Sequence, residues 1–426
     1  MSERFDSPEG QVAALGAATA QPRGWRRTFA ALGHRSYRLW FLGQLFSLLG
    51  TWMQATAQGY LVYQLTHSSA YLGLVAFAAG APTWLFMLWA GVLADRIPRR
   101  PMLIVTQTTM LLGSALLAGL VFAGVIRPWH IVALAFVLGS ANAFDAPARQ
   151  AFVLELVDRQ DLGNAIALNA LMFNSAVVVG PAVGGLVYAA LGPGWCFTAN
   201  AVSFLGVIGA LAAMRDLAPP PPRHDGSALA AMRQGLLYVA RHRQIRVIIG
   251  LLAAMTLLGF SYVSLLPAFA VKILHGDARV NGLLQSARGA GALATALYLA
   301  SLGRRRSFGR LLAVGSLLMP IGLLAFSAAR TLPLAMAALV VVGAGLILFF
   351  NNANALVQTL ADDGLRGRVM GAYSLTFFGL MPLGSLAAGT LADHIGEPWT
   401  VGLGAAALIV GAVAIHLTHP ALRALA

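Results

Sequence analysis

The sequence predicts an all-α membrane protein with twelve transmembrane helices in two six-helix pseudo-repeats. Of its 426 residues, 58% are hydrophobic and 10% are charged, and the mean hydropathy is +0.74. An ordinary soluble domain is about one quarter charged. The charges also fall in short clusters between long apolar runs, and these runs form two similar groups. A soluble enzyme, a disordered chain and a fibrous protein are therefore excluded.

Twelve apolar runs approach the length of about 20 residues that crosses a bilayer. Each is expected to be helical, because hydrocarbon cannot satisfy the hydrogen bonds of an open backbone. The expected spans are 39–61, 70–93, 102–124, 129–147, 165–190, 195–214, 246–268, 283–302, 311–328, 332–356, 370–391 and 400–417.

The basic residues predict the orientation, because cytoplasmic loops of membrane proteins carry an excess of Arg and Lys. With the N-terminus inside, the outer loops hold Arg127, Lys272, Arg279 and Arg330, and Arg288 lies within a span. The other 24 of the 29 basic residues then face the cytoplasm. This bias accounts for the net charge of +14 without nucleic-acid binding. We expect a multi-pass protein of the bacterial plasma (inner) membrane with both termini cytoplasmic.

The spans and charges divide the chain into five segments. A long connection follows the sixth span; it opens with four prolines, Pro219 to Pro222, and continues as a basic amphipathic stretch suited to the inner membrane surface. Cys196 is the single cysteine, so no disulfide and no cysteine-based metal site is expected. The segments are a cytosolic tail (1–36), a first half (37–214), a cytoplasmic central loop (215–245), a second half (246–418) and a cytosolic tail (419–426).

The two halves look like an internal repeat. Six residues recur at the same place in their helices when the chain is shifted by 209 or 204 residues. Such parallel six-helix repeats are a known transporter architecture. The pairs are Gly50 with Gly259, Gly73 with Gly282, Gly80 with Gly289, Gly185 with Gly389, Gly192 with Gly396, and Trp195 with Trp399.

The loop between the second and third spans, residues 91–100, reads GVLADRIPRR. It resembles the signature loop of the major facilitator superfamily, except that Pro98 replaces the second glycine. A positive-inside loop alone would explain its arginines but not Gly91 and Asp95. The resemblance implies a gating role for Gly91, Asp95, Arg96, Arg99 and Arg100.

The fifth span contains residues 179–185, VGPAVGG. They resemble the glycine–proline element of that superfamily's exporters, carried here by Gly180, Pro181, Gly184 and Gly185. Glycines at this spacing let helices approach closely, and proline bends a helix by removing a backbone donor. Ordinary tight packing is the alternative interpretation.

Residues 142–151, at the end of the fourth span, read NAFDAPARQA. Together with Gly163, Asn164 and the stretch 366–371, they are similar to the enterobactin-exporter or transmembrane secretion effector branch of the superfamily. The resemblance implies that Asp145, with Arg149 beside it, forms a charge network with the signature loop and faces Asp95 and Arg99.

Polar residues mark one face of the first span, at intervals of three and four that place them on one side of a helix. Such a face is expected to look inward, either onto a cavity or onto a neighbouring helix. For Arg288, a substrate contact and an arginine snorkelling to the surface are both left open. The expected cavity residues are Gln44, Ser47, Thr51, Gln54, Gln58, Asn169, Gln285, Arg288 and Asn351.

No carboxylate lies in the middle of a span, and the sequence has no Walker loop, metal-spaced histidines or hydrolase elbow. We therefore expect no enzyme, metal or cofactor, and transport driven by a gradient. The expected function is secondary active export of a small amphipathic or aromatic compound, siderophore-like or drug-like, by a monomer among membrane lipids. Protons are the expected coupling ion, with Asp145 or Asp95 as carrier. Uptake of a metabolite, or a receptor or assembly factor without flux, are the alternatives.

Overall fold

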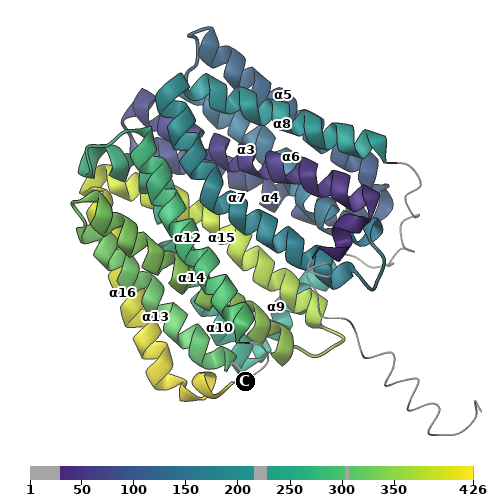
Figure 1. The fold of residues 1–426 in the computed structure, drawn as a ribbon. Coiled ribbons are helices and arrows are strands. Elements are labelled where there is room, and N and C mark those ends of the chain that lie inside the picture. Colours follow the sequence, from purple (N-terminus) through teal and green to yellow (C-terminus); the bar gives the residue numbers. More distant parts are fainter. Residues whose placement is uncertain (1–28, 215–227, 303–306, 426) are drawn as a thin grey trace, which may run out of the picture.

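The computed structural model describes residues 29–214, 228–302 and 307–425, without the side chains of residues 87–96 and 228–231 (Figure 1). Within this part of the chain the protein is helical and has no strand. The first half consists of α3 (Arg35–Thr66), α4 (Ser69–Arg96), α5 (Arg99–Phe122), α6 (Pro128–Leu156), α7 (Leu162–Leu191) and α8 (Pro193–Ala213).

The second half repeats this series after the short helix α9 (Ala228–Arg241). Its first rod is composite, and the rods that follow are single helices. They are α10 (Arg243–Ala254) with η2 (Met255–Phe260), α11 (Tyr262–Ala268) and η3 (Phe269–Ile273), then α12 (Ala278–Ser301), α13 (Phe308–Ala328), α14 (Leu332–Leu360), α15 (Arg366–Ile395) and α16 (Glu397–Thr418). The predicted all-α fold with two six-helix halves is confirmed.

Ten of the described rods are long and apolar enough to cross a membrane. The other two long helices are α3 and α12, which are equivalent to the first and eighth predicted spans. Both carry the polar residues on which the cavity prediction was based. Their lower apolarity fits helices that are shielded from lipid by their neighbours.

The composite rod of the second half departs from a regular α-helix. Residues 255–260 and 269–273 are π-helical, on either side of α11. Such turns are frequent at functional sites because they re-aim side chains. Here Phe260, at the end of the first π-helical stretch, and Val263, Ser264 and Pro267 of α11 line the central cavity described below.

The repeat extends to the backbone. Gly192 ends α7 with φ of 90°, and Gly396 ends α15 with φ of 87°. This left-handed conformation favours glycine, because a side chain would be strained there. Position 192 shifted by 204 is position 396, so both halves turn in the same way between their fifth and sixth rods.

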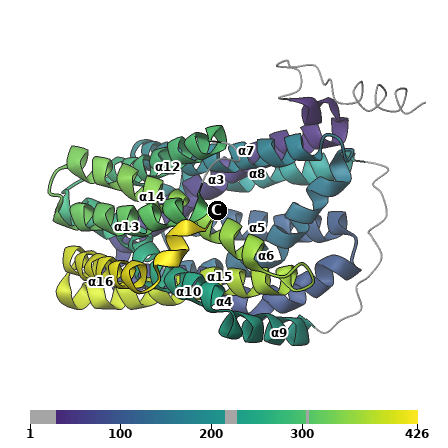
Figure 2. The same ribbon diagram turned by 90° about the horizontal axis from the view of Figure 1, so that it is seen from below.

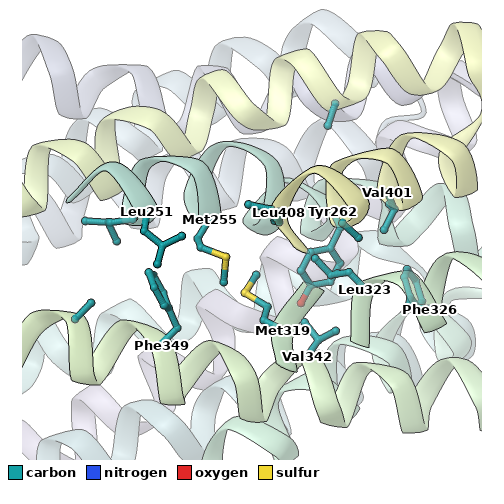
Figure 3. Close-up of a cluster of buried hydrophobic side chains, with 14 of the residues drawn as sticks. Leu251, Met255, Tyr262, Met319, Leu323, Phe326, Val342, Phe349, Val401 and Leu408 are labelled. Atoms are coloured by element: carbon teal, nitrogen blue, oxygen red, sulfur yellow. The ribbon is translucent and has the colours of Figure 1, made fainter. Parts of the chain in front are cut away.

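Apolar packing fills each half and also continues across the contact between them. In the second half, Met255, Tyr262, Met319 and Phe349 lie between the composite rod, α13, α14 and α16 (Figure 3). The first half has its own buried clusters, one around Tyr60 and Phe197 and another around Trp40. The cluster around Tyr60 also includes Ala268 and Ala278 of the second half, so part of the apolar core is shared between the halves.

The halves meet mainly along two helix pairs, α4 with α15 and α7 with α12, and the two views show these helices between the halves (Figures 1 and 2). We call the end of the bundle that holds the start of α3, the end of α16 and α9 the terminal side, and the other end the opposite side. On the terminal side α9 packs on α15, with Gly235 against the carbonyl of Arg368.

Candidate functional site

A cavity of about 400 Å³ lies between the halves. Helices of both halves line it: α3, α4, α5, α6 and α8 from the first, and the composite rod, α12 and α15 from the second. Leu72 and Val75, near the start of α4, lie at its wall. The cavity is therefore next to the opposite-side contacts between the halves.

Three of the predicted residues of α3 line this cavity, namely Thr51, Gln54 and Gln58, and Gln285 of α12 lines it from the other half. Gln54 is held in place because its Oε1 accepts a hydrogen bond of 2.8 Å from Nδ2 of Asn200 on α8. Gln285 Nε2 lies 3.5 Å from Oδ1 of Asn281. Both halves thus present amide groups to the same space.

Other polar lining residues were not predicted. They are Thr56 on α3 and, one from each of five further rods, Ser114, Asn142, Asn200, Ser264 and Ser385. The buried hydroxyl of Ser114 has no hydrogen-bond partner within the described part of the chain. Single polar residues in apolar spans are the only signal for them, and that signal does not distinguish a cavity wall from helix packing. Trp52, Phe204 and Phe260 supply aromatic surface, and none of the described lining residues is charged.

Four of the predicted cavity residues do not lie on its wall. Gln44 and Ser47 are buried against neighbouring helices towards the terminal side of α3. Asn169 is half-buried on α7, and Asn351 is exposed on α14. A regular face on one helix continues past the end of a cavity, because the cavity is shorter than the helix.

Arg288 is also absent from the cavity wall. It is 6% exposed, so it does not snorkel, and it lies beside the hydroxyl of Tyr262 on α11. Its Nε and Nη2 have no hydrogen-bond partner within the described part of the chain. Gln285, one turn earlier on α12, faces the cavity instead. The charge is therefore buried inside the second half.

The signature loop lies on the terminal side, where α4 ends and α5 begins. The side chains of Gly91, Asp95 and Arg96 lie outside the described residues. Arg99, the first residue of α5, is buried and forms an ion pair with Glu155 near the end of α6. Arg100 donates to the carbonyl of Ala212 at 3.1 Å. The loop is thus attached to the last turns of α6 and α8.

Asp145 is buried on α6, where it accepts two hydrogen bonds and forms an ion pair with Arg149, all within the first half. Thr106 Oγ1 is 2.9 Å away, Gln107 Nε2 is 2.8 Å away, and Arg149 Nε is 3.2 Å away. The expectation that Asp145 faces Arg99 is wrong, because Arg99 forms its ion pair with Glu155, which lies ten residues further along α6. Glu155 was not singled out from the sequence. Glu155 lies nearer than Asp145 to the C-terminal end of α6, and this end is close to the start of α5.

The glycines of residues 180–185 provide close contacts in two directions. A methyl group at Gly180 would lie 2.6 Å from Cβ of Trp52, and one at Gly184 would lie 2.9 Å from the carbonyl oxygen of Met53. These two glycines therefore pack α7 on α3. Gly185 packs on α12, and Pro181 presents its carbonyl to Gly282 of the same helix.

The described residues contain no group of three or more metal-ligating side chains. Two six-helix halves around a shared cavity, whose described lining carries no charge, are the architecture of a membrane transporter of the major facilitator type. A comparison with protein families then gives the particular group. The chain belongs to the transmembrane secretion effector family, whose profile matches residues 26–424.

Individual relatives are distant but cover most of the chain. It is 24% identical to the staphyloferrin A transporter of Staphylococcus aureus, over 84% of this chain and 90% of that protein. It is 27% identical to the multidrug efflux pump Tap of Mycolicibacterium fortuitum, over 88% and 93%. It is 28% identical to the enterobactin exporter EntS of Citrobacter koseri, over 68% and 72%.

Solved structures show the same fold. A crystal structure of the peptide transporter POT matches with a TM-score of 0.73 at 14% identity, over 96% of this chain and 98% of that one. A structure of the nucleoside transporter NupG matches with a TM-score of 0.68 at 14% identity, over 90% and 98%. The chain is therefore a multi-pass membrane transporter that acts on small molecules, and not an enzyme.

Proposed function

We propose that this protein is a secondary active exporter of small amphipathic or aromatic compounds at the bacterial plasma membrane, driven by the proton gradient through alternating access. The observation that carries the proposal is the central cavity, to which both halves contribute amides, hydroxyls and aromatic rings. A site between two repeats that move against each other is what alternating access requires.

The lining chemistry also favours one substrate class over another. A compound with several carboxylates would leave its charges unpaired in a cavity whose described walls carry no cation, and burying an unpaired charge is costly. An aromatic compound with a few hydrogen-bonding groups matches the rings of Trp52, Phe204 and Phe260 and the amides of Gln54 and Gln285. We therefore propose a neutral, drug-like or catechol-type substrate rather than a polycarboxylate.

Relatives support export. Tap is named as an efflux pump and EntS as an enterobactin exporter. The proposed orientation places the termini, α9 and the signature loop in the cytoplasm, in agreement with the distribution of Arg and Lys. The opposite side then faces outward.

Flux into inside-out membrane vesicles tests the proposal. The probe is the neutral aromatic dye N-phenyl-1-naphthylamine, with citrate as a polycarboxylate comparison. Uptake of the dye but not of citrate is expected when the vesicles are energised, and a protonophore should abolish it. Vesicles carrying Gln54→Ala test whether the flux uses this cavity.

Three results would contradict the proposal in different ways. Energised loss of preloaded dye would indicate uptake in the cell, and the absence of flux for either compound would favour a receptor or assembly factor. Flux that persists with the protonophore would exclude the proton gradient as the driving force.

A further inference from the structure

A set of polar and charged residues joins the halves on the opposite side, outside the cavity. Asp393, near the end of α15, accepts a hydrogen bond of 2.6 Å from the backbone N–H of Ser69 and another of 2.5 Å from the hydroxyl of Ser68. Ser69 is the first residue of α4. The first N–H groups of a helix have no partner within the helix and carry partial positive charge. Asp393 therefore caps α4 from the other half of the molecule.

A second carboxylate reinforces this contact. Glu397, the first residue of α16, is 2% exposed and accepts 2.7 Å and 2.8 Å hydrogen bonds from Ser69 Oγ and Lys272 Nζ. Lys272 also lies 5.8 Å from the ring centre of Tyr63 on α3. Lys272 and Glu397 belong to the second half, whereas Ser69 and Tyr63 belong to the first. The buried charge is thus neutralised within one half and linked to the other.

The equivalent helix of the second half is capped differently. Oδ1 of Asp277 accepts from the backbone N–H groups of Arg279 at 2.9 Å and Val280 at 3.3 Å, at the start of α12. The shift of 209 residues that relates the halves places Asp277 at Ser68. The cap of α12 is therefore local and does not depend on the distance between the halves, whereas the cap of α4 does.

We propose that Asp393, supported by Glu397 and Lys272, is a gating residue that holds the opposite side of the transporter closed. This inference rests on the proposed alternating-access function. Opening on this side separates α4 from α15, which removes the cap of α4 and the hydrogen bonds from Ser68 and Ser69. Closing restores them, so the carboxylate of Asp393 favours the closed arrangement through contacts that exist only there.

The distance between the halves tests this proposal. Spin labels are attached at Val125→Cys in the first half and Leu334→Cys in the second, in a Cys196→Ala background; positions 125 and 334 are exposed on the opposite side. Double electron–electron resonance in lipid nanodiscs then measures the open population. Asp393→Ala should raise that population at least about fivefold, the change that a loss of roughly one such contact produces. Ser68→Ala, which removes one of the bonds, should shift it in the same direction by less.

Two matched variants separate gating from simple helix capping. Asp277→Ala removes a cap whose hydrogen bonds lie within the second half, and should leave the distance distribution unchanged. Ser68→Asp combined with Asp393→Ala gives α4 a local cap like that of α12, and should recover thermal stability while the open population stays high.

Several outcomes would overturn the proposal. They are an unchanged distance distribution in folded Asp393→Ala and Ser68→Ala proteins, an equal shift in Asp277→Ala, or a return to the closed distance in the double variant. The readout does not depend on transport. If wild-type protein shows no flux but the distances respond as expected, the proposed function fails and the gating role of Asp393 stands.

Discussion

Between α7 and α12 the halves touch through glycines, backbone and one neutral hydrogen bond, which Ser286 Oγ donates to the carbonyl of Val178 at 2.6 Å. Between α4 and α15 the same backbone contact is accompanied by charged side chains. A methyl group at Gly185 would lie 2.5 Å from the carbonyl oxygen of Ala278, and one at Gly389 would lie 2.5 Å from that of Ser69. The shifts of 204 and 209 residues map each contact onto the other. The backbone geometry of the two pairs is therefore that of the repeat.

The side chains around these contacts have diverged. The positions of Asp393, Glu397 and Lys272 correspond in the first half to Ala189, Pro193 and Tyr63. One helix pair consequently closes by shape together with a neutral hydrogen bond, and the other closes by shape together with hydrogen bonds to charged groups. Variants at the two pairs can measure how much each kind of contact contributes.

The largest expected effect comes from removing the shared geometry. Gly185→Ala and Gly389→Ala should each prevent closure on the opposite side and lower transport at least about tenfold, because a Cβ cannot lie 2.5 Å from a carbonyl oxygen without separating the helices. The spin-label distance and dye flux measure this. Gly206→Ala on α8 is the control, since a Cβ there meets nothing within 4 Å. A much weaker effect at one of the two glycines would show that the pairs are not equivalent.

A smaller effect is expected from the charged pair alone. Lys272→Met leaves the buried carboxylate of Glu397 without its cation, which should cost about 2 kcal/mol. The melting temperature should fall by a few degrees, and adding Glu397→Gln should restore most of it. No recovery in the double variant would mean that Lys272 stabilises through its contact with Tyr63 rather than through charge.

In the cavity between the two helix pairs, Gln54 of the first half should contribute more to substrate affinity than Gln285 of the second half. Gln54→Ala leaves the buried amide of Asn200 without its 2.8 Å partner, whereas Gln285 has only a 3.5 Å contact to lose. We expect dye affinity to fall about fivefold to tenfold for Gln54→Ala, and about half as much in free energy for Gln285→Ala. Concentration-dependent flux measures both. Equal losses would indicate that the two amides bind substrate alike and that the bond to Asn200 has no influence.

The smallest effect is expected at Arg288. Burying a cation without an ion-pair partner is costly, and Arg288 has none within the described part of the chain, so an apolar side chain of similar length should not lower the stability. Arg288→Met should therefore leave dye affinity unchanged and the melting temperature equal or slightly higher. A large loss of affinity would place this arginine in the substrate path after all.

Much of the fold follows from local sequence properties. Apolar runs of bilayer length can satisfy their backbone in lipid only as helices, so their number and order predict the rods. The repeat is visible at Gly73, Gly185 and their equivalents, because a position where two backbones touch accepts no side chain in either half. The amide stripe of α3 likewise predicted that this helix faces inward, and Thr51, Gln54 and Gln58 do line the cavity.

Which side chains contact one another, and which of them reach the cavity, could be determined only from the tertiary structure. A stripe on one helix does not tell where the cavity ends, and so Gln44 and Ser47 were placed on a wall that they do not reach. From the sequence, either Asp145 or Glu155 on α6 could pair with Arg99. Only the packing of α5 on α6 shows that the partner is Glu155. The cap of α4 by Asp393 joins residues more than 300 positions apart. Such contacts arise from the way the two halves pack together, and no local pattern along the chain identifies which side chains become partners.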